Sequence, residues 1–272
     1  MRQPAVSGAF YDEDPDILRS SIARCFLSAR GPGELPSQSN MGSSRRIRGV
    51  VVPHAGYIFS GEIAAHAYLG LWKDGLPDTL VVIGPNHYGT SPHVSLSDED
   101  FVTPLGVAKV DAALSQKLAG GMVRFSSISQ ASEHSIEVQL PFLQFLRKDI
   151  TFVPVCMGRQ DPEHALTLGK RLSAALAGRD AVIVASSDFS HYVPPEIARK
   201  KDALAIDRIV KLDPAGLYET VISEDVTMCG YGPVMTMLHA CGGNAGTVLA
   251  YGHSGEVRQM DDVVGYCSIK IE

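Results

Sequence analysis

The sequence predicts one mixed α/β domain over residues 1–272, with a mostly parallel central sheet flanked by helices. From residue 47 onward, short apolar runs of strand type alternate with longer amphipathic segments, a pattern typical of parallel sheets covered by helices. The chain shows no repeat of fixed period, and its Gly-, Pro- and Ser-rich stretch at residues 31–46 is too short to separate two domains. A chain of 272 residues is long enough to bury its own core.

The expected elements follow one another along the chain. A helix at residues 16–29 precedes the loop at residues 31–46. The expected strands are residues 50–52, 80–83, 150–156 and 181–185, and the later helices are residues 61–71, 133–146, 162–176 and 195–210. Pro141 should bend the helix that contains it. Residues 93–111 suit an extra hairpin or antiparallel edge, and residues 246–253 and 263–271 have the same character.

Composition excludes several classes of protein. A hydrophobic content of 45%, a charged content of 20% and a net charge of -6 are those of a soluble globular protein and give no reason to expect nucleic acid or an anionic membrane as partner. No apolar run approaches the roughly 18 residues of a membrane span, and the N-terminal residues lack the apolar core of a signal peptide. Five cysteines without CxxC spacing indicate reduced thiols. We therefore expect a cytoplasmic protein.

Three predicted strands each lead into a histidine. VVVPHAG places His54 after the first strand, GPNHYG places His87 after the second, and SSDFSH places Asp188 and His191 after a third. The carboxyl ends of parallel strands lie at one edge of a sheet, where ligands bind. A lone histidine is more often a packed or surface residue, but three in equivalent places favour one shared site.

Two further histidine motifs have both a functional and a structural interpretation. In EHSIEVQL, His134 and Glu137 lie one turn apart at a predicted helix start and can face one pocket, or they can simply cap the helix. In SSDFSH, the spacing lets Asp188 orient His191. The neighbouring serines permit a serine triad, but the chain has no GxSxG elbow.

The cysteine in DVTMCGYGP lies in a predicted tight turn before an apolar helix. This residue, Cys229, can be a nucleophile or a metal ligand, because a helix N-terminus stabilises a thiolate. Structural burial is the alternative interpretation. Cys241 falls at the end of the same helix and suits a small buried hydrophobe.

Six motifs in order resemble one protein family. RQPAVSGAFY, PHAGYIFSG, GPNHYG, EHSIEVQLPFL, SSDFSHY and DVTMCG cover nearly the whole chain. Together they resemble the Memo family, also called AmmeMemoRadiSam system protein B. That family is similar in fold to the class III, LigB-type extradiol dioxygenases, which hold non-haem Fe(II) with two histidines and a carboxylate. The resemblance therefore implies a LigB-dioxygenase-like fold.

The resemblance also implies roles for individual residues. His54 and His87 match the two imidazole ligands, and Cys229 stands where the dioxygenases place their carboxylate. His134 and His191 match the pocket histidines that act on protons, with Asp188 as the residue that orients His191. Fe(II) is the ion that the resemblance implies. Zn²⁺ and copper are alternatives, because a thiolate is a softer ligand than a carboxylate. A thiolate beside activated O₂ is also open to oxidation, so dioxygenase activity is not simply inherited.

The expected function is oxygenase-like redox chemistry on an aromatic or chelating substrate. Tyr57 and Tyr192, beside two of these motifs, either shape the substrate pocket or pack structurally. One alternative is a non-catalytic module that binds a peptide or partner protein in the same pocket, and another is a Zn²⁺-dependent hydrolase. The resemblance implies an AMMECR-type protein and a radical SAM enzyme as pathway partners.

Overall fold

The central sheet of the protein is parallel in its middle and antiparallel at its sides. The computed structural model describes residues 1–37, 45–89 and 92–272, so the loop expected at residues 31–46 lies partly outside the described residues. The main path of the sheet runs in the order β10 (Gly246–His253), β11 (Val263–Ile271), β1 (Gly49–Val52), β8 (Ala181–Ser186), β2 (Thr79–Pro85), β7 (Thr151–Met157), β3 (Val94–Leu96) and β6 (Val123–Phe125). The four strands β1, β8, β2 and β7 are mutually parallel, which confirms the predicted fold class.

The flanking strands pair in the opposite direction. Strand β11 is antiparallel to both β1 and β10, and β3 is antiparallel to β7. A hairpin of β4 (Phe101–Thr103) and β5 (Gly106–Val110) forms within the region expected to add an antiparallel piece. The short strand β9 (His191–Val193) pairs with β11.

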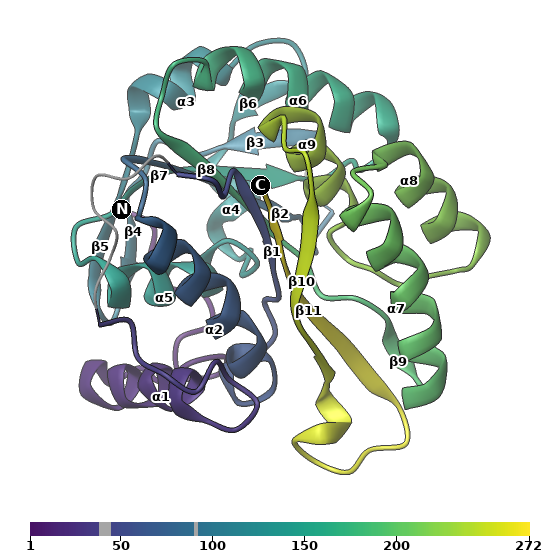
Figure 1. The fold of residues 1–272 in the computed structure, drawn as a ribbon. Helices are drawn as coiled ribbons and strands as arrows, with labels where there is room; N and C mark the ends of the chain where they lie inside the picture. Colours follow the sequence, from purple (N-terminus) through teal and green to yellow (C-terminus); the bar gives the residue numbers. More distant parts are fainter. Residues whose placement is uncertain (38–44, 90–91) are drawn as a thin grey trace.

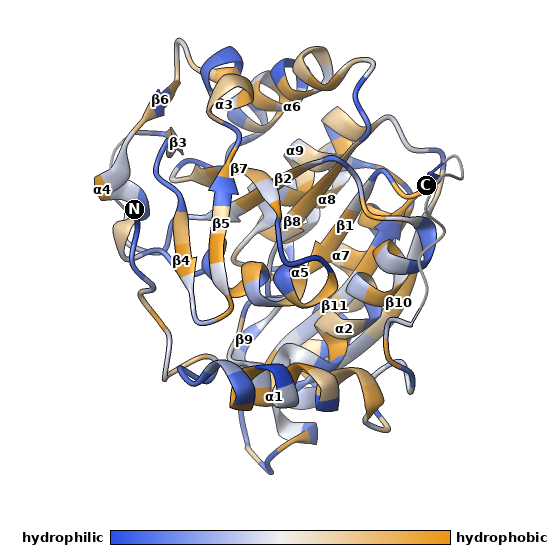
Figure 2. Ribbon diagram, turned by 90° about the vertical axis from the view of Figure 1, so that its left-hand side faces the viewer, coloured by the Kyte–Doolittle hydropathy of each residue, from blue (hydrophilic) through white to orange (hydrophobic). Residues whose placement is uncertain are grey.

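Helices cover both faces of the sheet (Figure 1). One face carries α1 (Pro15–Leu27), α2 (Tyr57–Asp74) and α5 (Leu140–Leu146), and the other carries α3 (Ala112–Leu118), α6 (Pro162–Leu176), α7 (Pro195–Val210), α8 (Pro214–Ser223) and α9 (Tyr231–Cys241). The short helix α4 (Ser127–Ala131) lies beside β3. Figure 2 shows that hydrophobic residues concentrate in the strands between these two layers.

Successive side chains of the central strands pack alternately into two separate hydrophobic cores. Val50 and Val52 of β1 pack into the core under α1 and α2, whereas Val51 packs into the core under α6 and α9. Successive side chains of a strand point to opposite faces, so a run of valines serves both layers. This explains why the central strands are continuous apolar runs in the sequence.

The segment predicted as a helix at residues 133–146 is helical only in its second half. It consists of a 3₁₀ turn η1 (Glu137–Gln139) followed by α5, and Pro141 lies in the first turn of α5. The predicted bend at Pro141 was therefore wrong. Proline suits a first turn, because the backbone N–H that it lacks has no partner there. Ser135 and Ile136 form a turn before η1, and Ser135 donates its hydroxyl hydrogen to the carbonyl of Pro85 at the end of β2.

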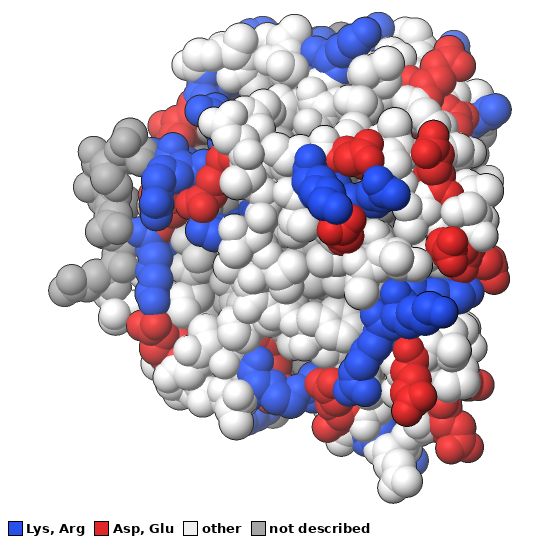
Figure 3. All heavy atoms as spheres, turned by 45° about the vertical axis from the view of Figure 1, so that its right-hand side comes forward, with Lys and Arg blue, Asp and Glu red and all other residues white. Residues whose placement is uncertain are grey.

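Positively and negatively charged side chains lie close together on the surface shown in Figure 3. Lysine and arginine side chains lie beside aspartate and glutamate side chains on this face. One surface ion pair of the described residues joins Arg199 and Glu256 at 3.2 Å. Among the described residues, no helix is both long enough and apolar enough to cross a bilayer.

Candidate metal centre

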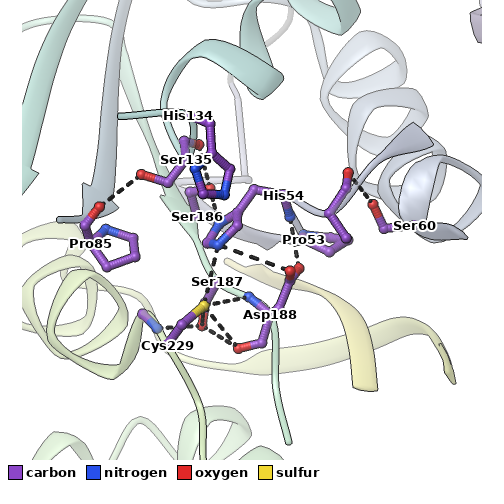
Figure 4. Close-up of polar contacts among 12 residues, drawn as sticks. Pro53, His54, Ser60, Pro85, His134, Ser135, Ser186, Ser187, Asp188 and Cys229 are labelled. Carbon is purple, nitrogen blue, oxygen red and sulfur yellow. Dashed lines mark hydrogen bonds and ion pairs between the residues drawn. The ribbon is translucent and has the colours of Figure 1, made fainter. Parts of the chain in front are cut away.

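The order of the central strands brings the predicted site residues to one edge of the sheet. Strand β8 lies between β1 and β2, with Val52 paired to Ser186 and Ile83 paired to Ala185. The segments that follow these three parallel strands therefore meet, and Figure 4 shows His54 lying close to Asp188 and Cys229. The rings of His54 and His87 lie 5.2 Å apart between centroids.

His54 is held in one tautomer by a serine at the end of β8. The Nδ1 atom of His54 lies 2.8 Å from Oγ of Ser186, and this hydroxyl donates its only hydrogen to the carbonyl of Ser135 at 2.7 Å. Ser186 must therefore accept a hydrogen bond from Nδ1–H of His54. The lone pair of His54 is then on Nε2, which faces Sγ of Cys229 at 3.2 Å. Burial lowers the pKa of His54, with His134 and His87 adding to the effect, so the imidazole is neutral and able to bind a metal.

Cys229 approaches His54 because its turn packs closely on the end of β8. The backbone N–H of Asp188 donates to Sγ of Cys229 at 3.2 Å. Gly230 follows the cysteine, and a Cβ atom there would lie only 2.4 Å from the carbonyl oxygen of Ser186, so a side chain would push the turn away. The amide of Gln160 donates to the carbonyl of Cys229 at 2.8 Å and supports the turn from the other side.

His87 is oriented by a carboxylate that the sequence did not single out. Glu133 accepts the backbone N–H of His87 at 2.7 Å and lies 3.0 Å from its Nδ1 atom. Burial favours the protonated acid, but the hydrogen bonds and charge of His87 lower the pKa of Glu133 to about 2. The carboxylate is thus ionised and accepts the hydrogen on Nδ1 of His87, which leaves Nε2 as the ring nitrogen that can bind a metal. A carboxylate that orients an imidazole in this way is common at metal sites.

Within the described part of the chain, two groups of His, Cys and Glu side chains have possible metal-ligand atoms within 4.8 Å of one another. One comprises His54, His87 and Cys229, and the other His87, Glu133 and His134. The oxygens of Glu133 already accept hydrogen bonds from His87 and from the backbone of Ser135, which favours the first group as the ligand set. Two imidazole nitrogens and a thiol sulfur suit a transition-metal ion such as Fe(II), Zn²⁺ or copper.

The surroundings of Cys229 favour the protonated thiol when no metal ion is bound. Burial raises the pKa of Cys229 well above its usual value, and the charge of Asp188 raises it further. A positive ion placed between the sulfur and the two imidazoles would reverse this balance, because a coordinating thiol loses its proton. Binding of a metal at this site is therefore coupled to release of a proton.

His134 lies against the predicted ligands and lines the same site. Its ring stacks on His87 with centroids 4.5 Å apart, and Phe10 packs against it with centroids 4.8 Å apart. Burial lowers the pKa of His134 to about 4, and the neighbouring His87 contributes to this shift. The imidazole is therefore neutral near pH 7.

Asp188 does not orient His191, contrary to the sequence prediction. Its carboxylate accepts the backbone N–H of His54 at 2.8 Å, and burial raises its pKa. His191 is held by Thr227 instead. Its Nδ1 atom lies 2.8 Å from the carbonyl oxygen of Thr227, and its backbone N–H donates to the threonine hydroxyl at 2.6 Å. Nδ1 of His191 therefore carries the hydrogen, and Nε2 is the nitrogen that can accept a proton.

Glu137 does not share a pocket with His134, which corrects a second expectation. It is fully buried and pairs with Arg2 at 2.7 Å. The same carboxylate accepts hydrogen bonds from the hydroxyl of Tyr11 and from the backbone of Ala5 and Val6. The 3₁₀ turn that contains Glu137 directs it toward the N-terminal segment. Its role is to hold the first residues of the chain over the sheet edge.

The two tyrosines beside the motifs differ in environment. Tyr57 is buried and donates its hydroxyl to the carbonyl of Val138, as expected of a packing residue. Tyr192 is 79% exposed and has a backbone φ of 55°, which is unusual for an aromatic residue. The positive φ lets Tyr192 turn outward beside His191, whose ring lies 5.9 Å away between centroids.

Comparison with known proteins establishes the family. A family model described as Memo-like protein matches residues 2–270. The chain belongs to the Memo family. A MEMO1 family protein from Methanothermobacter thermautotrophicus is 42% identical over 278 residues, which cover 99% of each chain. A MEMO1 family protein from Saccharolobus solfataricus is 41% identical over 279 residues, covering 99% of this chain and 98% of the other.

A more distant solved structure shares the fold of this Memo protein. The crystal structure of an uncharacterized protein from Escherichia coli K12 matches with a TM-score of 0.60 and 16% sequence identity. The match covers 84% of this chain and 100% of that chain. At this identity the likeness concerns the fold alone, and it agrees with the mixed α/β architecture.

Proposed function

We propose that this Memo-family chain is a metal-dependent, oxygenase-like redox enzyme. His54 and His87 would each bind Fe(II) through Nε2, and Cys229 would bind it through Sγ. The observation that carries the proposal is the convergence of these three donors within 4.8 Å, with both imidazoles held in the tautomer that ligation needs. Three protein ligands leave positions for a substrate, and Fe(II) in such a site supplies the redox chemistry with O₂.

The residues around these ligands would bind the substrate and move its protons. Nε2 of His191 is free to take a proton, because Nδ1 is held by the carbonyl of Thr227. The neutral ring of His134 lies against His87 and offers a second acceptor. Phe10 packs edge-on against His134 and adds an apolar ring beside it, which suits an aromatic substrate.

Oxygen consumption tests this proposal directly. The protein is purified without oxygen, loaded with Fe(II), and mixed with a set of catechols while dissolved O₂ is recorded. We expect substrate-dependent uptake by the wild type and none by His54→Ala. A matched control is His66→Ala, because His66 bonds the carbonyl of Arg30 and belongs to neither candidate ligand group.

Two results would count against the proposal. Failure of the iron-loaded wild type to consume O₂ with any catechol, although iron is bound at the three ligands, would count against an oxygenase. Ligand binding without turnover would favour a non-catalytic binding module.

A second candidate function is a Zn²⁺-dependent hydrolase, and Cys229 favours it. Thiolate and imidazole ligands are common at zinc sites, and a catalytic zinc keeps one position for a water molecule that it activates. Ester or amide hydrolysis by the zinc-loaded protein in the absence of O₂ would distinguish this activity from the first.

We also propose a cytoplasmic location and pathway partners. The five cysteines are free thiols, as a reducing compartment would keep them. The family resemblance supports an AMMECR-type protein and a radical SAM enzyme as partners in one pathway.

A further inference from the structure

Two histidines outside the metal centre approach each other closely at the surface. His93 directly precedes β3, and His164 lies in the first turn of α6. Nδ1 of His93 lies 3.0 Å from Nε2 of His164. The carbonyl of His93 also accepts the backbone N–H groups of Gly158 and Arg159, which follow β7. The backbone of His93 is therefore fixed relative to the start of α6.

A carboxylate sets the orientation of this pair. Oδ1 of Asp161 lies 2.7 Å from Nδ1 of His164 and accepts the backbone N–H of the same residue at 3.0 Å. Oδ2 of Asp161 accepts from Arg159 at 2.7 Å. Although partial burial works in the other direction, these hydrogen bonds hold the pKa of Asp161 well below its usual range. Nδ1 of His164 therefore carries a hydrogen, and the lone pair on Nε2 points toward His93.

We propose that Nδ1 of His93 and Nε2 of His164 form a second metal site, suited to a borderline divalent ion such as Zn²⁺ or Cu²⁺. Zinc–nitrogen bonds are about 2.0–2.1 Å long, which places two nitrogens on one ion roughly 3 Å apart. The measured separation of 3.0 Å matches this spacing. The carboxylate behind His164 repeats the arrangement of Glu133 behind His87 in the metal centre.

Binding of a metal ion at this pair would replace the hydrogen bond between the two imidazoles. In the metal-free pair, Nδ1–H of His93 donates to the lone pair of His164. An incoming ion breaks this hydrogen bond, and the two rings turn so that both lone pairs face the ion. Nδ1 of His93 loses its hydrogen to water while Nε2 of the same ring takes one up, so the imidazole stays neutral. His93 is exposed, so water molecules can complete the coordination shell. With two protein donors and no thiolate, this site should bind more weakly than the metal centre.

Zinc titration of the full-length chain tests the proposal. Bound zinc is measured by equilibrium dialysis followed by elemental analysis. The wild type should bind two ions per chain in two steps, the tighter at the metal centre and the weaker at the histidine pair. His93→Ala and His164→Gln should each abolish the weaker step and leave the tighter step unchanged. Asp161→Asn should lower the zinc affinity of the weaker step about 10- to 100-fold, because it removes the carboxylate that orients the imidazole of His164.

Two comparisons make the result specific. His66→Gln removes a different half-buried histidine and should preserve both steps. Cys229→Ser should weaken the tighter step and preserve the weaker one, so failure of the metal centre and failure of the histidine pair are separable. A weaker step that survives in both His93→Ala and His164→Gln would show scattered surface binding and overturn the proposal. A single step in the wild type would show that the pair is only a hydrogen bond.

Discussion

Nε2 of His54 lies 3.2 Å from Sγ of Cys229, although 175 positions separate the two residues in the chain. Asp188 forms hydrogen bonds with both residues and holds them together. Its carboxylate accepts the backbone N–H of His54, and its own backbone N–H donates to the sulfur. A residue that the sequence suggested as a partner of His191 thus positions two predicted ligands instead. The short distance means that the thiol must give up its hydrogen for a metal to bind between the two atoms.

Metal affinity should therefore rise with pH. Burial raises the pKa of Cys229, so the thiol is protonated at neutral pH and each bound ion displaces one proton. Below the thiol pKa, we expect the association constant to increase about tenfold for each unit of pH. Competition titrations with a chelator between pH 6 and pH 8 measure this slope. A flat profile would mean that Cys229 does not ligate the ion.

Substitutions of Cys229 should change the metal that binds. Cys229→Ser should weaken binding strongly, because a hydroxyl is a poor anionic donor. Cys229→Asp should partly restore Fe(II), since it recreates a site of two histidines and a carboxylate. Cys241→Ser is the matched control, because this half-buried cysteine ends α9, and it should cost about 1 kcal/mol of stability without loss of metal. Metal titrations of the three variants decide the question, and wild-type affinity in Cys229→Ser would make this cysteine structural.

Glu133→Gln should weaken the metal centre without unfolding the chain. The carboxylate holds both the backbone and Nδ1 of His87, and an amide replaces one of its acceptor oxygens by a donor. Loss of such a partner typically costs about 10- to 100-fold in metal affinity. Elemental analysis after dialysis, together with a circular dichroism melt, separates the loss of metal from loss of fold. Unchanged affinity would show that His87 needs no carboxylate.

The arrangement of strands and helices was predictable because it follows from short-range patterns. The valine runs of β1 and β8 identify buried parallel strands, and the predicted helix at residues 195–210 coincides with α7. The helix at residues 133–146 was placed too early. Helical spacing of its apolar residues does not reveal that Ser135 lies in a separate turn, where its hydroxyl donates to the carbonyl of Pro85 at the end of β2.

The candidate site was only partly predictable for a related reason. Motifs at strand ends identified His54 and His87, since the carboxyl edge of a parallel sheet is a fixed geometric location. Residues that contact the site histidines from distant positions in the sequence were harder to predict. Glu133 stands beside His134 in the motif EHSIEVQL, yet its bond to His87 spans 46 positions. The contact of Thr227 with His191 spans 36 positions and also depends on the fold.

The N-terminal segment should contribute strongly to stability through one ion pair. Arg2 and Glu137 are both buried and lie 2.7 Å apart. Removing one partner of a buried pair typically costs about 3–5 kcal/mol, because the other charge stays uncompensated. We expect Arg2→Ala to lower the free energy of unfolding in urea by about this amount. Lys211→Ala, which breaks an exposed pair with Asp207, should change it by less than about 1 kcal/mol. Equal effects of the two substitutions would contradict this role.

His134 and His191 should act on the bound substrate rather than hold the metal. His134 stacks on His87 outside the favoured ligand set, and His191 is anchored by Thr227 with Nε2 free. We expect His134→Ala and His191→Ala to keep the metal content of the wild type and to lose turnover, by about 100-fold or more if each group transfers a proton. His191→Gln offers a finer test, because an amide keeps a hydrogen bond to Thr227 but cannot act as a base. Elemental analysis and oxygen uptake on the same samples give both readouts. Loss of metal from His191→Ala, together with full metal content in Cys229→Ser, would show that His191 supplies the third ligand.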